Sequence, residues 1–299
     1  LIVGLAICFG GIVSSAAISR GAAGYIQVYI DANTLVLLTL FILINVGFAC
    51  WGVLESVSIA ATITVIEICG ILLVCYIGYP NVDSLTSNTQ ALLPTAAWKD
   101  WASVFAAALL AFYAYIGFED MVNMGDEVKN PGRTLPTSIL LALGISTLLY
   151  IVVAVVFIAS VPLDVLAKSD SPFVDIIERN STLPTSFITL ISLLAITNGA
   201  LVQIIMSSRI LYGMSSHQLI PAIFGYVNAR TQTPLFTTLF VGAMVLVFAS
   251  FLQLESLARL TSYILLTVFA LVNLALILIK RVGSDNGKTA QHFIAPTYA

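Results

Sequence analysis

Charged residues are scarce in this sequence. Lys, Arg, Asp and Glu together make up 9% of its 299 residues, whereas hydrophobic residues make up 59%. A soluble globular domain has about 25% charged residues, and the mean hydropathy of this chain is +1.03. Because so little polar surface is available to face water, the chain is not expected to be a soluble domain, and lipid is its predicted solvent.

A strong charge of one sign is also absent. The formal net charge is −3, and no stretch of the chain forms a basic patch of the kind that binds nucleic acid. We therefore expect no nucleic-acid partner.

Cysteine and histidine are too few and too dispersed to predict a metal site. His217 and His292 lie far apart, and the four cysteines lie in or beside apolar runs without CxxC or Cys/His ligand spacing. The HExxH motif and the nucleophile elbow are missing as well. The sequence thus predicts no metal, no cofactor and no catalytic residue. A membrane enzyme that uses Glu67 and Glu119 as acid and base is a rival that no motif supports. The cysteines are Cys8, Cys50, Cys69 and Cys75.

Long apolar runs dominate what is present. A helix needs about 20 apolar residues to cross a bilayer, and eight runs of this kind predict an all-α integral membrane protein. The first run is rich in Gly, Ala and Ser, which let helix backbones approach closely, so we expect it to pack inside a bundle. The predicted spans cover residues 1–22, 35–53, 57–79, 101–121, 137–161, 185–208, 235–252 and 258–280.

The cations between these spans are unevenly distributed. Three lie on one side and seven on the other, and because cytoplasmic loops are enriched in Lys and Arg, the side with seven is predicted to be cytoplasmic. Eight spans then place both ends of the chain in the cytoplasm, in a multi-pass protein of the cell membrane. Residues 282–299 are expected to form a polar tail or linker, and the apolar start predicts that the sequence begins within a larger protein. The three cations are Lys99, Lys168 and Arg179, and the seven are Lys129, Arg133, Arg209, Arg230, Lys280, Arg281 and Lys288.

Glu67 lies in the middle of the predicted span 57–79. A carboxylate at the centre of a membrane helix costs about 2.5–3.5 kcal/mol on insertion scales, so we expect it to face the interior of the bundle. There it must be paired or protonated. A role in proton coupling and a structural hydrogen bond between helices are both open interpretations.

The predicted span 101–121 contains a weak point for a helix. Gly117 is followed two residues later by Glu119, in the half of the span nearer the predicted cytoplasmic side. Non-helical backbone at membrane depth is tolerated where it lines a cavity, and transporters use such broken helices to bind substrates. Residues 113–119 are therefore a candidate for an unwound binding segment, and the alternative is an intact helix with a packing glycine and an interfacial glutamate. The candidate binding residues of this segment are Tyr113, Ala114, Ile116, Gly117 and Glu119.

Further polar residues lie within the predicted spans. Asn198 and Gln203 fall in the span 185–208, Ser15 in the small-residue span and Ser262 in the last one. Polar side chains of this kind can hydrogen-bond across helices or line a pocket, and the sequence leaves both interpretations open.

Three segments resemble a known family of permeases. Residues 112–139, FYAYIGFEDMVNMGDEVKNPGRTLPTSI, are similar to the sixth-span signature of amino acid–polyamine–organocation permeases, an aromatic stretch that runs into G-F-E and then E-x-K-N-P-x-R-x-x-P. Residues 207–234, SSRILYGMSSHQLIPAIFGYVNARTQTP, are similar to the end of the family's eighth span, S-R-x-L-Y-x-M. Residues 16–25, AAISRGAAGY, resemble the end of the third span.

The resemblance implies an inverted-repeat fold of five plus five helices. Residues 1–281 would form a partial transmembrane permease domain that covers the third to the tenth helix. Residues 1–79 would belong to the first repeat and residues 101–281 to the second. The first two and last two helices of the family would be missing, including the first-span break that holds the carboxylate and amine of the substrate.

The resemblance also implies roles for individual residues. Tyr113 would be an aromatic gate, and Ile116 and Gly117 would form the unwound point of the sixth span. Glu119 would be the carboxylate that links the gate to neighbouring helices, and residues 127–133 would form a cytoplasmic turn. The wall of the pocket would include Ser15, Asn198, Gln203 and Ser262.

The sequence departs from the family pattern at two places. Glu67 stands where some relatives carry a lysine that substitutes for a sodium ion, which leaves Glu67 as a candidate for proton coupling. Residues 215–218, SSHQ, stand where the family usually has A-R-D-G, so the cytoplasmic charge differs there.

These features together predict a secondary active transporter of amino acids or related amines. Its expected partners are the substrate, the lipid bilayer and, if transport is coupled, protons, whereas the oligomeric state is not predicted. One alternative is a non-transporting membrane sensor of amino acids with the permease fold. A purely structural subunit is another.

Overall fold

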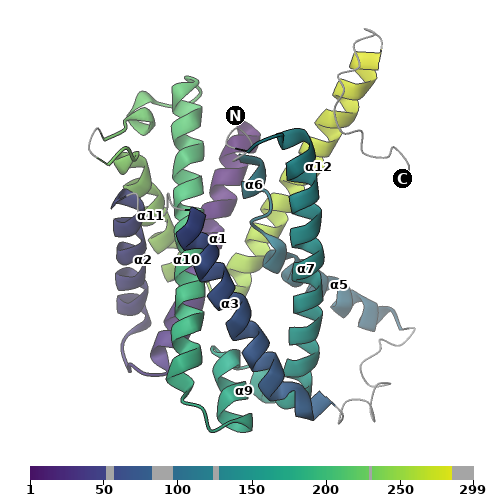
Figure 1. Ribbon diagram of the computed structural model, residues 1–299. Helices are drawn as coiled ribbons and strands as arrows, with labels where there is room; N and C mark the ends of the chain where they lie inside the picture. Colours follow the sequence, from purple (N-terminus) through teal and green to yellow (C-terminus); the bar gives the residue numbers. More distant parts are fainter. Residues whose placement is uncertain (52–56, 83–96, 124–127, 229–230, 285–299) are drawn as a thin grey trace.

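The computed structural model describes residues 1–51, 57–82, 97–123, 128–228 and 231–284. All regular structure in these ranges is helical, and the helices form a bundle (Figure 1). The elements are α1 (Ile2–Gln27), α2 (Thr34–Trp51), α3 (Val57–Gly78), η2 (Tyr79–Asn81), α5 (Trp98–Phe112), η4 (Tyr113–Tyr115), α6 (Asp120–Asn123), α7 (Pro131–Ser160), α8 (Leu163–Leu166), α9 (Pro172–Asn180), α10 (Thr185–Ser216), η6 (Ala222–Gly225), α11 (Leu235–Phe251) and α12 (Leu254–Ser284).

The prediction of an all-α membrane protein is confirmed. Within the described ranges, six helices are long and apolar enough to cross a membrane, namely those built on α1, α2, α3, α7, α10 and α12. The apolar helix α11 has 17 residues and matches the predicted span 235–252. The predicted span 101–121 differs, because the chain there divides into α5, η4 and α6.

The ends of some helices differ from the sequence prediction. Helix α7 begins at Pro131, within the stretch 127–133 that was expected to be a turn. Asn130, at a φ of +55°, occupies the N-cap position without a side-chain capping hydrogen bond. A proline is well accommodated at the first helical position because its missing N–H has no helical partner there. Residues 282–284 of the expected tail belong to α12, whereas residues 285–299 lie outside the described residues.

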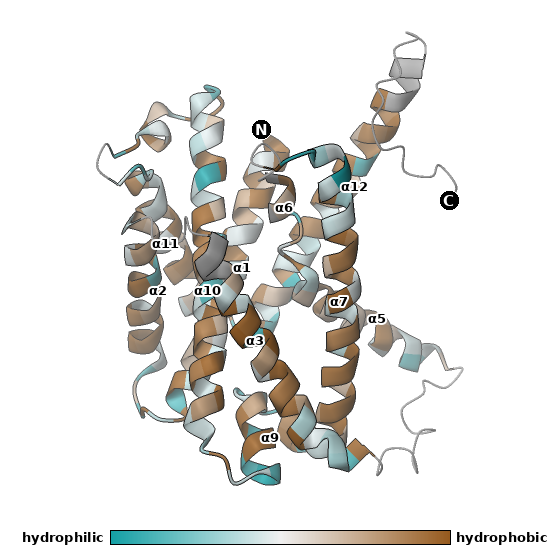
Figure 2. Ribbon diagram, viewed as in Figure 1, coloured by the Kyte–Doolittle hydropathy of each residue, from teal (hydrophilic) through white to brown (hydrophobic). Residues whose placement is uncertain are grey.

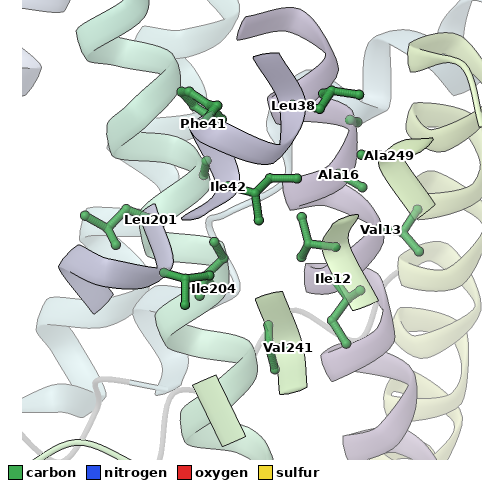
Figure 3. Packing of buried hydrophobic residues seen from close by; sticks show 14 of the residues in the cluster. Ile12, Val13, Ala16, Leu38, Phe41, Ile42, Leu201, Ile204, Val241 and Ala249 are labelled. Atoms are coloured by element: carbon green, nitrogen blue, oxygen red, sulfur yellow. The ribbon is translucent and has the colours of Figure 1, made fainter. Parts of the chain in front are cut away.

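Helix α1 lies at the centre of the bundle and packs against α10, α12, α11 and α2. Half of its membrane window is buried, compared with 6% of that of α7. Small side chains make this possible, since Ser15 and Ala16 are fully buried on α1. Figure 3 shows Ile12, Val13 and Ala16 meeting apolar side chains of α2, α10 and α11. The expectation that the first span packs inside the bundle is confirmed.

Arg20, near the end of α1, holds the end of a neighbouring helix. Its Nε donates to the carbonyl of Ala249 at 2.6 Å, and its Nη2 donates to the carbonyl of Ser250 at 3.2 Å. The last carbonyls of α11 have no partner within their own helix. The guanidinium therefore satisfies them and pairs with the negative end of the helix dipole.

Helix α7 lies at the periphery of the bundle. It is apolar over most of its length in Figure 2, and only 6% of its apolar window is buried among the described residues. The start of α1 and the end of α12 lie toward the same end of the bundle (Figure 1). This arrangement agrees with an even number of membrane crossings between them.

Candidate functional site

The helical path of the chain breaks between α5 and α6. After α5, η4 continues as a single 3-10 turn, in which the Tyr113 carbonyl accepts the Ile116 N–H at 3.2 Å. Ile116 then becomes extended, with a ψ of 136°, and Gly117 adopts a φ of +120°. Residues with a Cβ atom rarely adopt a φ of this kind, so the backbone conformation requires glycine at position 117. The break thus lies at the glycine that the sequence singled out.

Glu119 satisfies one backbone group that the break leaves free. Its carboxylate Oε2 accepts the N–H of Gly117 at 2.8 Å. The carbonyl of Glu119 accepts the Val122 N–H at 3.1 Å, where the chain turns into α6. A backbone N–H that leaves the helical pattern inside an apolar span needs another acceptor. Glu119 therefore stabilises the broken conformation directly.

Tyr113 ties the break to the central helix α1. Its hydroxyl donates to the Ser14 carbonyl at 3.1 Å, and the Ser14 hydroxyl donates to the Tyr113 oxygen at 3.4 Å. Ser15, the candidate from the sequence, instead donates to the carbonyl of Ala200 on α10 at 3.4 Å. Neighbouring residues on a helix point in directions about 100° apart. The two serines therefore face different partners, and Ser14 is the one that meets the break.

Helix α7 contributes two residues that the sequence analysis did not single out. The hydroxyl of Tyr150 donates to the Ala114 carbonyl, and the rings of Tyr150 and Tyr115 meet edge to face at 5.1 Å. The Tyr115 hydroxyl donates to Thr147 Oγ1 at 3.1 Å. Two polar residues three positions apart in an apolar span share one helix face. That spacing is the sequence signal that could have identified them.

Helix α12 supplies an aromatic contact to both sides of the break. The ring centroid of Phe269 lies 6.3 Å from that of Phe112, before the break, and 5.4 Å from that of Phe118, after it. Aromatic pairs at such distances add packing energy beyond the buried area alone. The broken segment is therefore held by α1, α7 and α12 together.

A second polar pair joins α3 and α10. The side-chain amide of Asn198 donates to the Glu67 carboxylate at 3.3 Å. The Asn198 Oδ1 atom is buried and has no hydrogen-bond partner among the described residues. The sequence predicted that Glu67 would face the interior, and the structure brings it together with another candidate residue. These two lie on a different pair of helices from Tyr113 and Ser14.

The two other candidate residues lie at contacts between helices. Gln203 is 9% exposed on α10, beside Gly11 of α1. Ser262 is fully buried, and its hydroxyl donates to the carbonyl of Ala258 in its own helix at 3.0 Å. Across the described part of the chain, no three His, Cys, Asp or Glu side chains are grouped so that they could hold a metal ion.

The break exposes backbone groups that can bind a ligand. Backbone groups leave the helical pattern within the predicted span 101–121. Such groups can bind the charged ends of a small zwitterionic or amine ligand without any covalent step. The surrounding hydroxyl groups of Tyr113 and Ser14 add further polar partners at the same place.

Comparison of the sequence with known proteins places this chain in a family. A sequence model of the family described as "Amino acid permease" matches residues 1–299. The Branched-chain amino acid permease BcaP of Bacillus subtilis is 28% identical over 235 residues, which cover 78% of this chain and 49% of that protein. The vacuolar Cationic amino acid transporter 2 of Arabidopsis thaliana is 27% identical over 288 residues, which cover 94% of this chain and 44% of that protein.

A third relative widens the range of cargoes named. The Methylthioribose transporter of Bacillus subtilis is 28% identical over 232 residues, which cover 77% of this chain and 49% of that protein. The chain spans about half the length of the curated relatives it matches. The family match extends over the central helix, the broken span and the polar pair alike. This multi-pass membrane chain therefore belongs to the amino acid permease family, as its resemblance to the amino acid–polyamine–organocation permeases predicted.

Proposed function

We propose that this chain is the central part of a secondary active transporter that moves amino acids or related amines across the cell membrane. The observation that carries the proposal is the break at Gly117, where an apolar predicted span lacks continuous helical hydrogen bonds. A break of this kind destabilises an apolar helix unless the freed backbone groups find other hydrogen-bond partners. A polar ligand can supply such partners.

The ligand class follows from the groups that the break frees. Backbone carbonyls in residues 113–117 have two lone pairs each, so they can accept an ammonium group even where one hydrogen bond is already made. The Gly117 N–H already donates to Glu119, so a carboxylate would be bound by a backbone N–H beyond Gly117. The names of two relatives refer to branched-chain and cationic amino acids. Groups common to all amino acids would be bound at the break, so the break by itself does not select among side chains.

Transport requires binding without covalent chemistry. A ligand is moved when the outward-facing and inward-facing states bind it differently and interconvert. Glu67, paired with Asn198, is our candidate for binding a proton that couples to this change. An enzymatic function is not proposed, since the relatives are named as permeases and transporters.

The membrane arrangement completes the proposal. We infer that both ends of the chain face the cytoplasm, because Lys and Arg are more frequent on that side of the predicted spans. We also infer that residues 1–79 belong to the first of two inverted repeats and residues 101–281 to the second.

Uptake into liposomes tests the proposal. The full-length parent protein is reconstituted, and the entry of tritiated leucine and tritiated arginine is compared with that into empty liposomes. We expect uptake of at least one of them, and we expect Gly117→Val to abolish its binding without loss of expression. Binding without uptake would fit a sensor instead. Uptake by Gly117→Val at the wild-type affinity would contradict the role of the break.

A further inference from the structure

The carbonyl of Ala114 is satisfied by another helix. In a continuous helix it would accept the N–H group four residues later, but the chain turns away at Gly117 and the Tyr150 hydroxyl of α7 donates to it instead. The neighbouring Tyr113 carbonyl keeps a backbone donor, the Ile116 N–H at 3.2 Å. Tyr150 therefore takes the place of a helical hydrogen bond at the break.

Tyr150 is itself held in this position. Its ring meets the Tyr115 ring at 5.1 Å, with the planes 86° apart, and the Tyr115 hydroxyl donates to Thr147 Oγ1 at 3.1 Å. The Thr147 hydroxyl in turn donates to the Leu143 carbonyl at 2.7 Å. Thr147 and Tyr150 lie three positions apart and so present one polar face of α7 to η4. The contact with Ala114 is thus part of a connected set of hydrogen bonds and ring packing.

We propose that Tyr150 is a positioning residue for ligand binding, which keeps the span open across Gly117 by occupying the Ala114 carbonyl. The inference rests on the proposed function, since it takes residues 113–119 as part of the ligand site. Without the hydroxyl, the Ala114 carbonyl lacks its partner, and the Phe118 N–H is the donor that a continuous helix would supply. Closing the helix in this way removes the freed backbone groups from the ligand.

The effect on binding follows from this competition between two conformations. The apparent affinity falls in proportion to the fraction of molecules with the span open. Because Tyr150 acts through the backbone, the loss is the same for every amino acid bound at the break. A residue that touched the ligand's side chain would change the preference among amino acids.

The test uses Tyr150→Phe in the full-length protein, which keeps the ring and its contact with Tyr115. Equilibrium binding of tritiated leucine and tritiated arginine is measured on purified protein, together with thermal unfolding. We expect the Kd for each bound amino acid to rise by the same factor, about 3- to 10-fold, with an unchanged melting temperature. Tyr76→Phe, at a tyrosine of α3 that is 78% exposed, is the matched control and should bind like the wild type.

Thr147→Val is a second variant, which serves if Tyr150→Phe fails to fold. It removes the acceptor of Tyr115 and leaves the Tyr150 hydroxyl in place, so we expect a smaller rise in Kd that is again equal for the bound amino acids. An unchanged Kd in the folded Tyr150→Phe protein overturns the inference, and so does a changed ratio of the leucine and arginine affinities. If Tyr150→Phe does not fold, an unchanged Kd in Thr147→Val overturns it.

The wild type separates this inference from the proposed function. A wild-type protein that neither binds nor takes up either amino acid overturns the proposed function, and the inference falls with it. A wild type that binds, together with Tyr150→Phe at equal affinity, overturns the inference alone.

Discussion

The break at Gly117 allows backbone conformation to be tested separately from packing. Gly117 has a φ of +120°, and a Cβ added to it would meet no atom of the described residues within 4 Å other than its chain neighbours. Alanine would therefore fit sterically, but it reaches this region only with a strain of about 1–3 kcal/mol. Gly117→Ala should accordingly weaken amino acid binding by about 5- to 150-fold, since about 1.4 kcal/mol changes an equilibrium constant tenfold.

Gly144 of α7 provides the matched control for this substitution. A Cβ added there also meets no described atom within 4 Å, but its backbone is that of an ordinary helix. Gly144→Ala should leave binding unchanged and slightly favour the helix. The assay is equilibrium binding of tritiated leucine and arginine to the purified full-length protein, with thermal unfolding measured in parallel. Equal affinities for the Gly117 and Gly144 variants would refute the reasoning.

Three further predictions address the other contacts. Glu67→Gln keeps an acceptor for the neighbouring amide but removes the titratable group, so the pH dependence of uptake should change; normal uptake with an unaltered pH profile would make Glu67 structural. Tyr113→Phe removes both hydrogen bonds with Ser14 and should raise the Kd by about 2- to 10-fold. Ser14→Ala removes only the bond from the serine hydroxyl, because the Ser14 carbonyl stays, and should raise the Kd by less. The double variant should lose no more than Tyr113→Phe alone, and additive losses would contradict the pairing. Arg20→Ala should lower the free energy of unfolding by about 1.5–3 kcal/mol, as hydrogen bonds to a charged group are lost; an unchanged melting curve would contradict this role.

The membrane fold could be predicted because apolar runs of spanning length have few other stable outcomes. The ends of the helices were less predictable, since they depend on local capping and not on hydropathy. Helix α7 starts six residues before the predicted span, at Pro131, because proline is well accommodated at the first helical position. Helix α1 likewise runs on to Gln27, beyond the apolar run that ends near residue 22.

The place of the break could also be predicted, because glycine is the residue that tolerates a φ of this kind. The partners of the break could not. Whether Ser14 or Ser15 meets Tyr113 depends on the rotation of α1 about its axis, which tertiary packing sets. The contact between Tyr150 and Ala114 depends in the same way on how α7 lies against the broken segment.

The polar residues within spans show a related limit. Asn198 reaches Glu67 on another helix, whereas Ser262 bonds within its own helix. In the sequence, both residues are polar groups within an apolar run, and nothing there distinguishes them. A serine hydroxyl can donate to the carbonyl four residues earlier, and this option needs no neighbour at all.

The most direct measurement is a structure of the full-length protein with leucine or arginine bound. We expect the ammonium or carboxylate group of the ligand within hydrogen-bond distance, about 3.2 Å or less, of backbone atoms in residues 113–117, with Gly117 still at a positive φ. A ligand bound elsewhere, with residues 113–119 in a continuous helix, would contradict the assignment of the break as part of the substrate site.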